Sequence, residues 1–322
     1  MLYTLTQATK KLYCNIKKRF VNAIHERKIL KAEYRQLQTR ASILKQNNPK
    51  FFKPEKLLVE SGNSAVECLA KILDTKDKSP IQLINRLGSL SQGFFARTLG
   101  DKPTYQETVN TVCKKLNLPT PLSPYQGERS IAIHCFQEMY KKLSPTQKEE
   151  YENALRKQGE LLKKLNPSLA PSMISAGAII AGKMSGFGVY LAASTLVGAI
   201  TSTLGITLPF IFYTTMSSAI SIFLGPVGWV AVGAMVIGTI FGPDFSKVTQ
   251  GIILIASLRA EKELEWKILI SDVRKDLKSI FIKLQKNLLK ILGLGLILLL
   301  YWLAIPLLIF IFAIFIEKFL SL

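Results

Sequence analysis

Charged side chains are missing from the sixty residues between Met184 and Pro243, although the chain carries 42 Lys and Arg and 22 Asp and Glu in total. A helix needs roughly 20 apolar residues to cross a bilayer core of about 30 Å, so this window is long enough for two or three crossings. It is also rich in Gly, Ala, Ser and Thr, which suits close helix contact in lipid. The alternative is the central hydrophobic hairpin of a soluble helical protein.

Histidine and cysteine are also scarce, with only two and four residues of each type. His134 and Cys135 are adjacent and cannot chelate one ion from one helix face, and a zinc site needs more ligands than the chain offers at workable spacing. A Cys–His nucleophile stays open in three dimensions, but an ordinary core or surface histidine is the commoner case. We therefore expect no enzyme activity, no metal and no cofactor.

The cysteines Cys14, Cys68, Cys113 and Cys135 show no close pairing, which indicates reduced thiols in a cytosolic compartment rather than a disulfide framework. Met1 to Lys11 has no apolar core of a signal peptide, so we do not expect export of the N-terminal part.

Acidic residues are too few to balance the basic ones, and the formal net charge is +20. Residues 1–60 alone hold 14 Lys and Arg against 4 Asp and Glu. Such an excess indicates an anionic partner, and lipid headgroups, nucleotides and nucleic acid all fit it. Charge by itself does not choose among them.

The apolar sequence divides at Gly and Pro into segments of different length. Gly186–Leu204 and Ile206–Leu224 are each near spanning length, whereas Val227–Phe241 is shorter and is expected to re-enter or lie at the interface. Ile291–Ile316 has 26 residues without a charge, about 39 Å as a helix. Lys283, Lys286 and Lys290 precede it and place its start on the cytosolic side. We expect about three spans.

Helical spacing of apolar residues predicts a long amphipathic helix over residues 4–46. Its apolar positions are Leu12, Ile16, Phe20 and Ile24, followed by Leu30, Tyr34, Leu37, Ala41 and Leu44. It should end near Asn47–Pro49, with a linker over Lys50–Pro54. Residues 55–165 have helical breaks and almost no strand-like alternation, which predicts a compact helical unit. A second amphipathic helix is expected before the last span.

These patterns predict an all-α fold, oligomeric, with a helical cytosolic domain and an α-helical transmembrane region. Five parts follow: 1–54, a basic amphipathic helix and linker; 55–170, the helical domain; 171–258, a Gly-rich apolar membrane region; 259–290, a basic amphipathic helix; and 291–322, the C-terminal transmembrane helix.

Basic side chains on the first helix are the candidate site for an anionic ligand, because three aromatic residues are interleaved with them and could stack on bases. The opposing interpretation is a solvated or lipid-facing side of the helix. The candidates are Lys10, Lys11, Lys17, Lys18, Arg19, Arg27, Lys28, Lys31 and Arg35, and the aromatic residues are Tyr13, Phe20 and Tyr34.

Several short motifs occur in a fixed order along the chain. They are Ser61-Gly62-Asn63-Ser64; Tyr105, Glu107, Val109, Val112 and Lys114 to Leu116; Leu224-Gly225-Pro226-Val227-Gly228-Trp229; Gly242-Pro243; and Leu258-Arg259. In these motifs the chain resembles the YaaW-like family, whose members are helical proteins labelled as similar to ubiquinol-cytochrome c chaperones. The motifs cover roughly residues 57–165 and 222–260. The tyrosine–arginine pair that the family has after Gly-Pro is Phe245-Ser246 here, and the first helix and the last span are additions. The resemblance implies a helical core and a chaperone-like role.

The sequence predicts an oligomeric membrane effector that forms a pore with a leaning toward anions. An anionic ligand such as a nucleotide or oligonucleotide would gate it, and the setting we expect is bacterial anti-phage defence. Its partners are then the lipid bilayer, copies of itself and that ligand, at the bacterial inner membrane with the N-terminal domain cytosolic. The alternative is a membrane-anchored chaperone or assembly factor. The pore or gate candidates, chosen for hydroxyl groups or Gly-Pro bends, are Thr201, Ser202, Thr214, Thr215, Ser218, Gly225, Pro226, Gly228 and Trp229.

Overall fold

Two compact units make up the part of the chain that the structure, a computed structural model, describes: residues 2–92, 102–142, 144–146, 148–149, 152–153 and 243–320. Unit 1 combines Met1–Gln46 with Ile270–Leu322, and unit 2 comprises Asn47–Leu269. All the secondary-structure elements in the described ranges are helices, which confirms the prediction of a helical protein.

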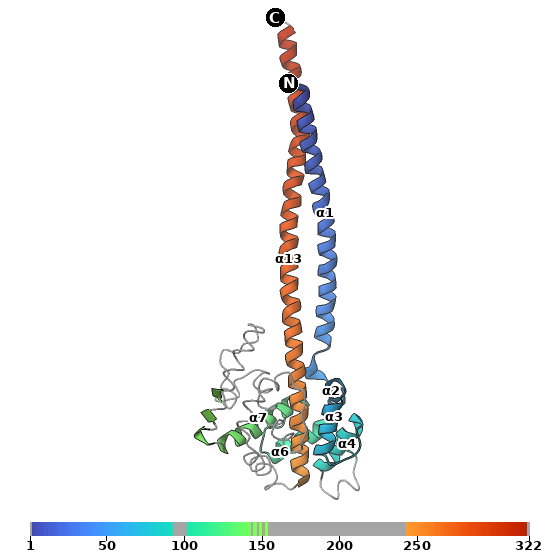
Figure 1. Cartoon of the computed structure of the whole chain (residues 1–322), viewed down its shortest axis with the longest axis vertical. Coiled ribbons are helices and arrows are strands. Elements are labelled where there is room, and N and C mark those ends of the chain that lie inside the picture. Colours follow the sequence, from blue (N-terminus) through green and yellow to red (C-terminus); the bar gives the residue numbers. More distant parts are fainter. Residues whose placement is uncertain are drawn as a thin grey trace. The chain divides into compact units, whose positions relative to one another are not determined.

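Unit 1 is an antiparallel pair formed by α1 (Leu2–Gln46) and the C-terminal part of α13 (Pro243–Leu320) (Figure 1). Three contacts fix the direction. The rings of Tyr13 and Tyr301 stack with centroids 5.1 Å apart. Further along, Asn287 Nδ2 donates to Glu26 Oε2 at 3.0 Å, and the Tyr34 ring lies 6.5 Å from that of Phe281. Residue numbers therefore rise on α1 as they fall on α13.

The two helices meet along a seam with heptad spacing. Buried and half-buried positions of α1 alternate three and four residues apart from Tyr13 to Leu44, and the same alternation links positions of α13 from Ile270 to Tyr301. This is the period of a left-handed coiled coil. The seam positions are Tyr13, Ile16, Phe20, Ala23, Arg27, Leu30, Tyr34, Leu37, Ala41 and Leu44 on α1, and Ile270, Val273, Leu277, Ile280, Leu284, Asn287, Ile291, Leu294, Leu298 and Tyr301 on α13.

Local signals place the helices of unit 2. Gly62 separates two of them with φ at 84°, a value that favours glycine. Pro54, Pro80 and Pro124 each begin a helix, where the missing N–H costs nothing. Thr104 and Glu107 form a capping box. The elements before α13 are η1 (Pro49–Phe51), α2 (Pro54–Ser61), α3 (Asn63–Ile72), α4 (Pro80–Ser91), α6 (Tyr105–Lys115) and α7 (Pro124–Lys142).

The N-terminal part of α13 is the central helix of unit 2, and every residue from Gly251 to Glu261 is buried. At Gly251 an added Cβ would lie 2.6 Å from Leu87 Cδ1, so α13 approaches α4 closely at this point. Burial on every side is typical of a core helix, and this stretch packs in the core of unit 2. The part of α13 from Phe245 to Leu258, which the sequence analysis places at the end of the Gly-rich apolar membrane region, contributes to that core.

The rest of α13 contains the predicted last span. Within the described residues one helical segment, Asp244–Ala304, is long and apolar enough to cross a membrane, with a mean hydropathy of 1.9 in its apolar window. The predicted separate helices over 259–290 and 291–322 are one continuous helix. The predicted segments Gly186–Leu204, Ile206–Leu224 and Val227–Phe241 lie outside the described residues.

Candidate functional site

A buried ion pair joins α7 to α13 at the centre of unit 2. Arg259 and Glu128 are 2% and 1% exposed. Two parallel hydrogen bonds connect them: Arg259 Nε donates to Glu128 Oε2 at 2.6 Å and Arg259 Nη2 donates to Oε1 at 2.9 Å. Bidentate geometry of this kind is the strongest that a guanidinium and a carboxylate make. Burial disfavours the charged guanidinium, and the carboxylate of Glu128 outweighs that effect, so the pKa of Arg259 is raised.

The same guanidinium holds the short helix η1 in place. Arg259 Nη1 donates to the carbonyl oxygens of Pro49 at 3.0 Å and Phe52 at 2.6 Å, with a longer contact to Lys50 at 3.5 Å. The Pro49 carbonyl also accepts the backbone N–H of Phe52 at 3.1 Å, so the guanidinium is a second donor to it. Each of the three guanidinium nitrogens has a protein acceptor. Arg259 therefore positions residues 49–52.

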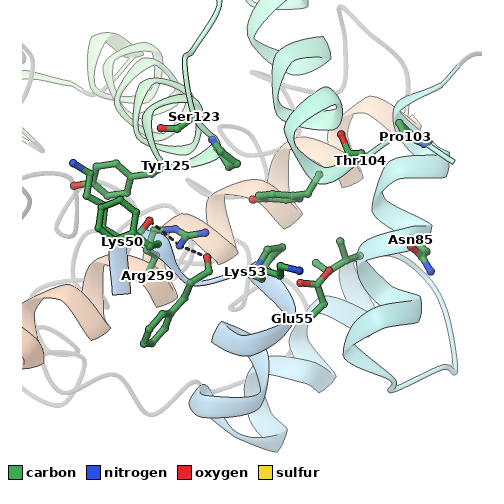
Figure 2. Close-up of a pocket in the computed structure, with 15 residues that line it drawn as sticks. Lys50, Lys53, Glu55, Asn85, Pro103, Thr104, Ser123, Tyr125 and Arg259 are labelled. Carbon is green, nitrogen blue, oxygen red and sulfur yellow. Dashed lines mark hydrogen bonds between the residues drawn. The ribbon is translucent and has the colours of Figure 1, made fainter. Parts of the chain in front are cut away.

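A cavity of about 620 Å³ opens beside this ion pair. Figure 2 shows Tyr125 and Arg259 at one end and Asn85 and Thr104 at the other. Four aromatic residues contribute to its walls. Lys50 and Lys53 also line the cavity. The aromatic lining residues are Phe51, Phe52, Tyr105 and Tyr125. Ligand sites commonly combine apolar and aromatic walls with a few placed polar groups, as this cavity does.

Tyr105 brings a buried hydroxyl to the wall of this cavity. Burial, followed by the charge of the Glu128 carboxylate and its action as a hydrogen-bond acceptor, raises the pKa of Tyr105 well above its usual value, so the group stays protonated. Tyr105 thus adds a neutral polar group beside the Arg259–Glu128 ion pair.

Exposed cations surround the aromatic lining. Lys50 Nζ lies 5.1 Å from the centroid of the Tyr125 ring and 5.9 Å from that of Phe51. Lys56 Nζ lies 3.5 Å from the centroid of Phe52. These cation–π contacts keep positive charge close to flat apolar surfaces. The pocket thus suits a ligand with a planar apolar part and an anionic group.

The candidate residues on α1 lie along the coiled coil of unit 1 and contribute nothing to this pocket. Eight of the nine basic side chains are exposed, whereas Arg27 lies half-buried on the seam. The interleaved aromatic residues face α13: Tyr13 stacks on Tyr301, and Tyr34 packs near Phe281. They are seam residues, so the predicted stack of bases between the cations is not supported. The exposed cations remain available to an anionic surface.

Two further groups of candidate residues came from the sequence: the Cys–His nucleophile and the pore or gate residues. Cys135 is 3% exposed, and burial followed by the charge of Glu138 raises its pKa to about 12, which argues against a Cys–His nucleophile with His134. Burial likewise raises the pKa of Cys68 to about 12. The predicted pore and gate residues, Thr201 to Trp229, lie outside the described residues.

Comparison with protein-family models, with curated proteins and with solved structures gave no match to this chain. The resemblance to the YaaW-like family therefore stays a prediction. Two of the residues that carry it, Tyr105 and Arg259, line the same pocket.

Sequence reasoning missed Glu128 and the pocket itself. Glu128 lies 131 residues before Arg259, so no local spacing relates them. The one available signal was an acidic residue within the helix that follows Pro124, among otherwise apolar core positions such as Ile131 and Phe136.

Proposed function

We propose that this chain is a membrane-attached effector whose helical unit binds an anionic ligand with a planar apolar part. The observation that carries the proposal is that one helix, α13, contributes to two sites. It supplies Arg259, which fixes the pocket segment, and it continues into the uncharged run Ile291–Ile316. A ligand that changes the pocket therefore acts on the helix that carries the membrane segment.

Nucleotides and short oligonucleotides are the ligand class that fits best. Their bases supply planar apolar surface for Phe52 and Tyr125, and base–aromatic stacking is worth roughly 1–3 kcal/mol per base. Their phosphates would meet the exposed Lys50 and Lys53. The net charge of +20 favours the approach of such an anion.

Binding can be tested by calorimetry on the full chain in detergent, with ATP, a cyclic dinucleotide and a short oligoadenylate as probes. Replacing both pocket lysines, K50E with K53E, should weaken binding of whichever probe binds, by at least tenfold. The matched control is K76E with K114E, which makes the same charge change at exposed positions that do not line the pocket. Equal losses in the two variants would show that net charge and not the pocket binds the probe.

We further propose that the effector acts as an oligomeric pore with a leaning toward anions. Support comes from the sixty uncharged residues 184–243, whose Ser and Thr hydroxyls prefer a partner helix or a water-filled lumen. No acidic residue occurs in that window, so a ring of carboxylates selecting cations is excluded there. Planar bilayers with purified protein should show ligand-dependent current whose reversal potential in a KCl gradient indicates anions.

A membrane-anchored assembly factor is the second candidate, because Phe51 is 77% exposed at the pocket and could grip an apolar client. Exchanging residues 186–241 for an unrelated membrane hairpin separates the two. An anchor would survive the exchange with its activity intact, whereas a pore would lose its conductance.

A further inference from the structure

The two halves of the coiled coil in unit 1 have different environments. In the half nearer the chain ends, α1 residues 10–23 lie alongside α13 residues 291–304, as the Tyr13–Tyr301 stack and the contact of Phe20 with Gly295 show. Here α13 has apolar residues on its outer side as well as on the seam. Leu292, Leu296, Leu299 and Leu303 are each between 58% and 61% exposed.

The apolar outer side of α13 is suited to contact with lipid acyl chains, whereas the adjoining part of α1 is not. A helix that is apolar all round belongs in a core or a membrane, and Ile291–Ile316 is long enough to span one. The adjoining part of α1 carries five exposed cations: Lys10, Lys11, Lys17, Lys18 and Arg19. Cations at the centre of a bilayer are costly, and the bilayer core has no water to solvate them. The paired state and the membrane-spanning state therefore exclude each other.

A polar layer marks where this part of the seam begins. Asn287, 5% exposed, donates to Glu26, and Lys290 Nζ lies 3.8 Å from the same carboxylate. Arg27 Nε and Asn287 Oδ1 are buried without hydrogen-bond partners. Unsatisfied polar atoms weaken a packed seam. On the other side of this layer, Leu30–Leu44 pair with Ile270–Leu284. Both segments are amphipathic, so their apolar side chains lie on the seam and their polar side chains face water.

We propose that α1 residues 10–23 separate from α13 at this layer and bind the anionic headgroups of a bilayer as Ile291–Ile316 inserts. The basic segment of α1 then contacts anionic lipid headgroups, and the exposed leucines of α13 contact acyl chains. The seam between Leu30–Leu44 and Ile270–Leu284 stays closed. This inference rests on the proposed membrane attachment of the last span and is independent of the pore.

The test locks one half of the seam at a time in the full chain. Ala23 faces Ile291 and Leu37 faces Leu277 in the antiparallel register, so A23C with I291C locks the separating half and L37C with L277C locks the other. Both pairs are made with C14S, because Cys14 is exposed. W229F and W266F leave Trp302 as the only tryptophan, and quenching of its fluorescence by brominated acyl chains reports insertion.

Oxidised protein is reconstituted into vesicles of phosphatidylcholine with phosphatidylglycerol. The L37C/L277C lock should be quenched as fully as the unlocked chain, whereas quenching in the A23C/I291C lock should fall to the level without brominated lipid and return on reduction. Replacing the five cations with Gln in the A23C/I291C lock should restore quenching, because a neutral α1 can enter with its partner.

Full quenching of the oxidised A23C/I291C lock would overturn the inference and leave membrane attachment standing. Continued protection of the Gln variant would also overturn it, because something other than charge would then block entry. Absence of quenching in the unlocked chain would overturn both the inference and the attachment of this span. Vesicles of phosphatidylcholine alone should give weaker quenching of the unlocked chain, and equal quenching would contradict the role of anionic lipid.

Discussion

Arg259 shows how a charge is kept in the interior of unit 2. Its guanidinium donates to both oxygens of Glu128 and to the backbone carbonyls of Pro49 and Phe52, so both charges of the pair are compensated. Pairs of this kind owe little net stability to their mutual attraction, because desolvation offsets it. Removing one partner costs more stability than removing both, because the remaining charge is then buried without a partner and without water.

The first prediction concerns this asymmetry. R259M should destabilise unit 2 by about 3–5 kcal/mol, because it leaves Glu128 buried and unpaired. R259M with E128L should recover part of that loss, although the carbonyl of Phe52 loses the donor that Arg259 provides. Urea denaturation followed by circular dichroism measures both. K262M, which removes a partly exposed pair with Glu265, is the control and should change stability by less than about 0.5 kcal/mol. An R259M variant no weaker than this control would contradict the argument.

The second prediction concerns alkaline pH. Burial raises the pKa of Cys68 from 9.0 to about 12, and burial followed by the charge of Glu138 raises that of Cys135 to about 12. The folded state thus holds these two protons more tightly than the unfolded chain. Their effect on stability is constant below about pH 9 and is lost between pH 9 and 12, with a slope of about 1.4 kcal/mol per pH unit and thiol.

Urea midpoints at several values between pH 8 and 11 test this. The free energy of unfolding of the native chain should fall more steeply with pH than that of a variant with C68A and C135A. The alanine variant controls for the lysines and tyrosines that titrate in the same range. Parallel slopes would show that the two thiols are not desolvated as described.

The first helix shows how far periodicity carries a prediction. Its extent was predicted as residues 4–46 and is Leu2–Gln46. Its packing side was predicted less well, because Leu12 and Ile24 were assigned to it while Tyr13 and Ala23 lie on the seam. A seam with a 3.5-residue period drifts away from a straight 3.6-residue stripe. A small residue such as Ala23 and a charged one such as Arg27 also give no apolar signal.

The candidate site was harder to predict than the helices. The helical unit over residues 55–165 was predicted from breaks in the helical pattern, which are local signals, and prolines begin both α4 and α7 within it. The pocket depends on Glu128 and Arg259, which come together only in the folded unit. The burial of residues 244–258 in the core was likewise not predicted, because core helices and membrane helices have similar apolar composition.

The polar layer of the coiled coil gives the third prediction. A buried polar pair commonly fixes register at a cost in stability. Replacing Arg27 and Asn287 together by Leu should therefore raise the melting temperature of the coiled coil and permit slippage by one heptad. Disulfide formation measures the register in detergent. A cysteine at position 291 should pair only with one at position 23 in the native background, and with one at 16 or 30 as well in the leucine variant. An unchanged pattern of disulfides would contradict the register role.

Among the described residues, the buried core cluster of unit 2 is built from residues between Leu57 and Leu264. This gives the fourth prediction, that removing residues 1–46 leaves unit 2 as stable as before. Pulse alkylation of Cys68, Cys113 and Cys135 in rising urea follows the opening of that core, because all three are buried there. The urea midpoint should be the same with and without α1. A lower midpoint in the shortened chain would show that unit 1 supports unit 2.

The position of α13 in the core also bears on how the protein is made. Unit 2 cannot close around Phe245 to Leu264 until those residues have left the ribosome, and the uncharged stretch 184–243 is synthesised before them. Domains close as units during synthesis, and exposed apolar chain invites aggregation. Under the proposed membrane role, the apolar stretch would therefore reach the membrane while the helical unit is still open. Completion of the pocket beside Arg259 would follow it.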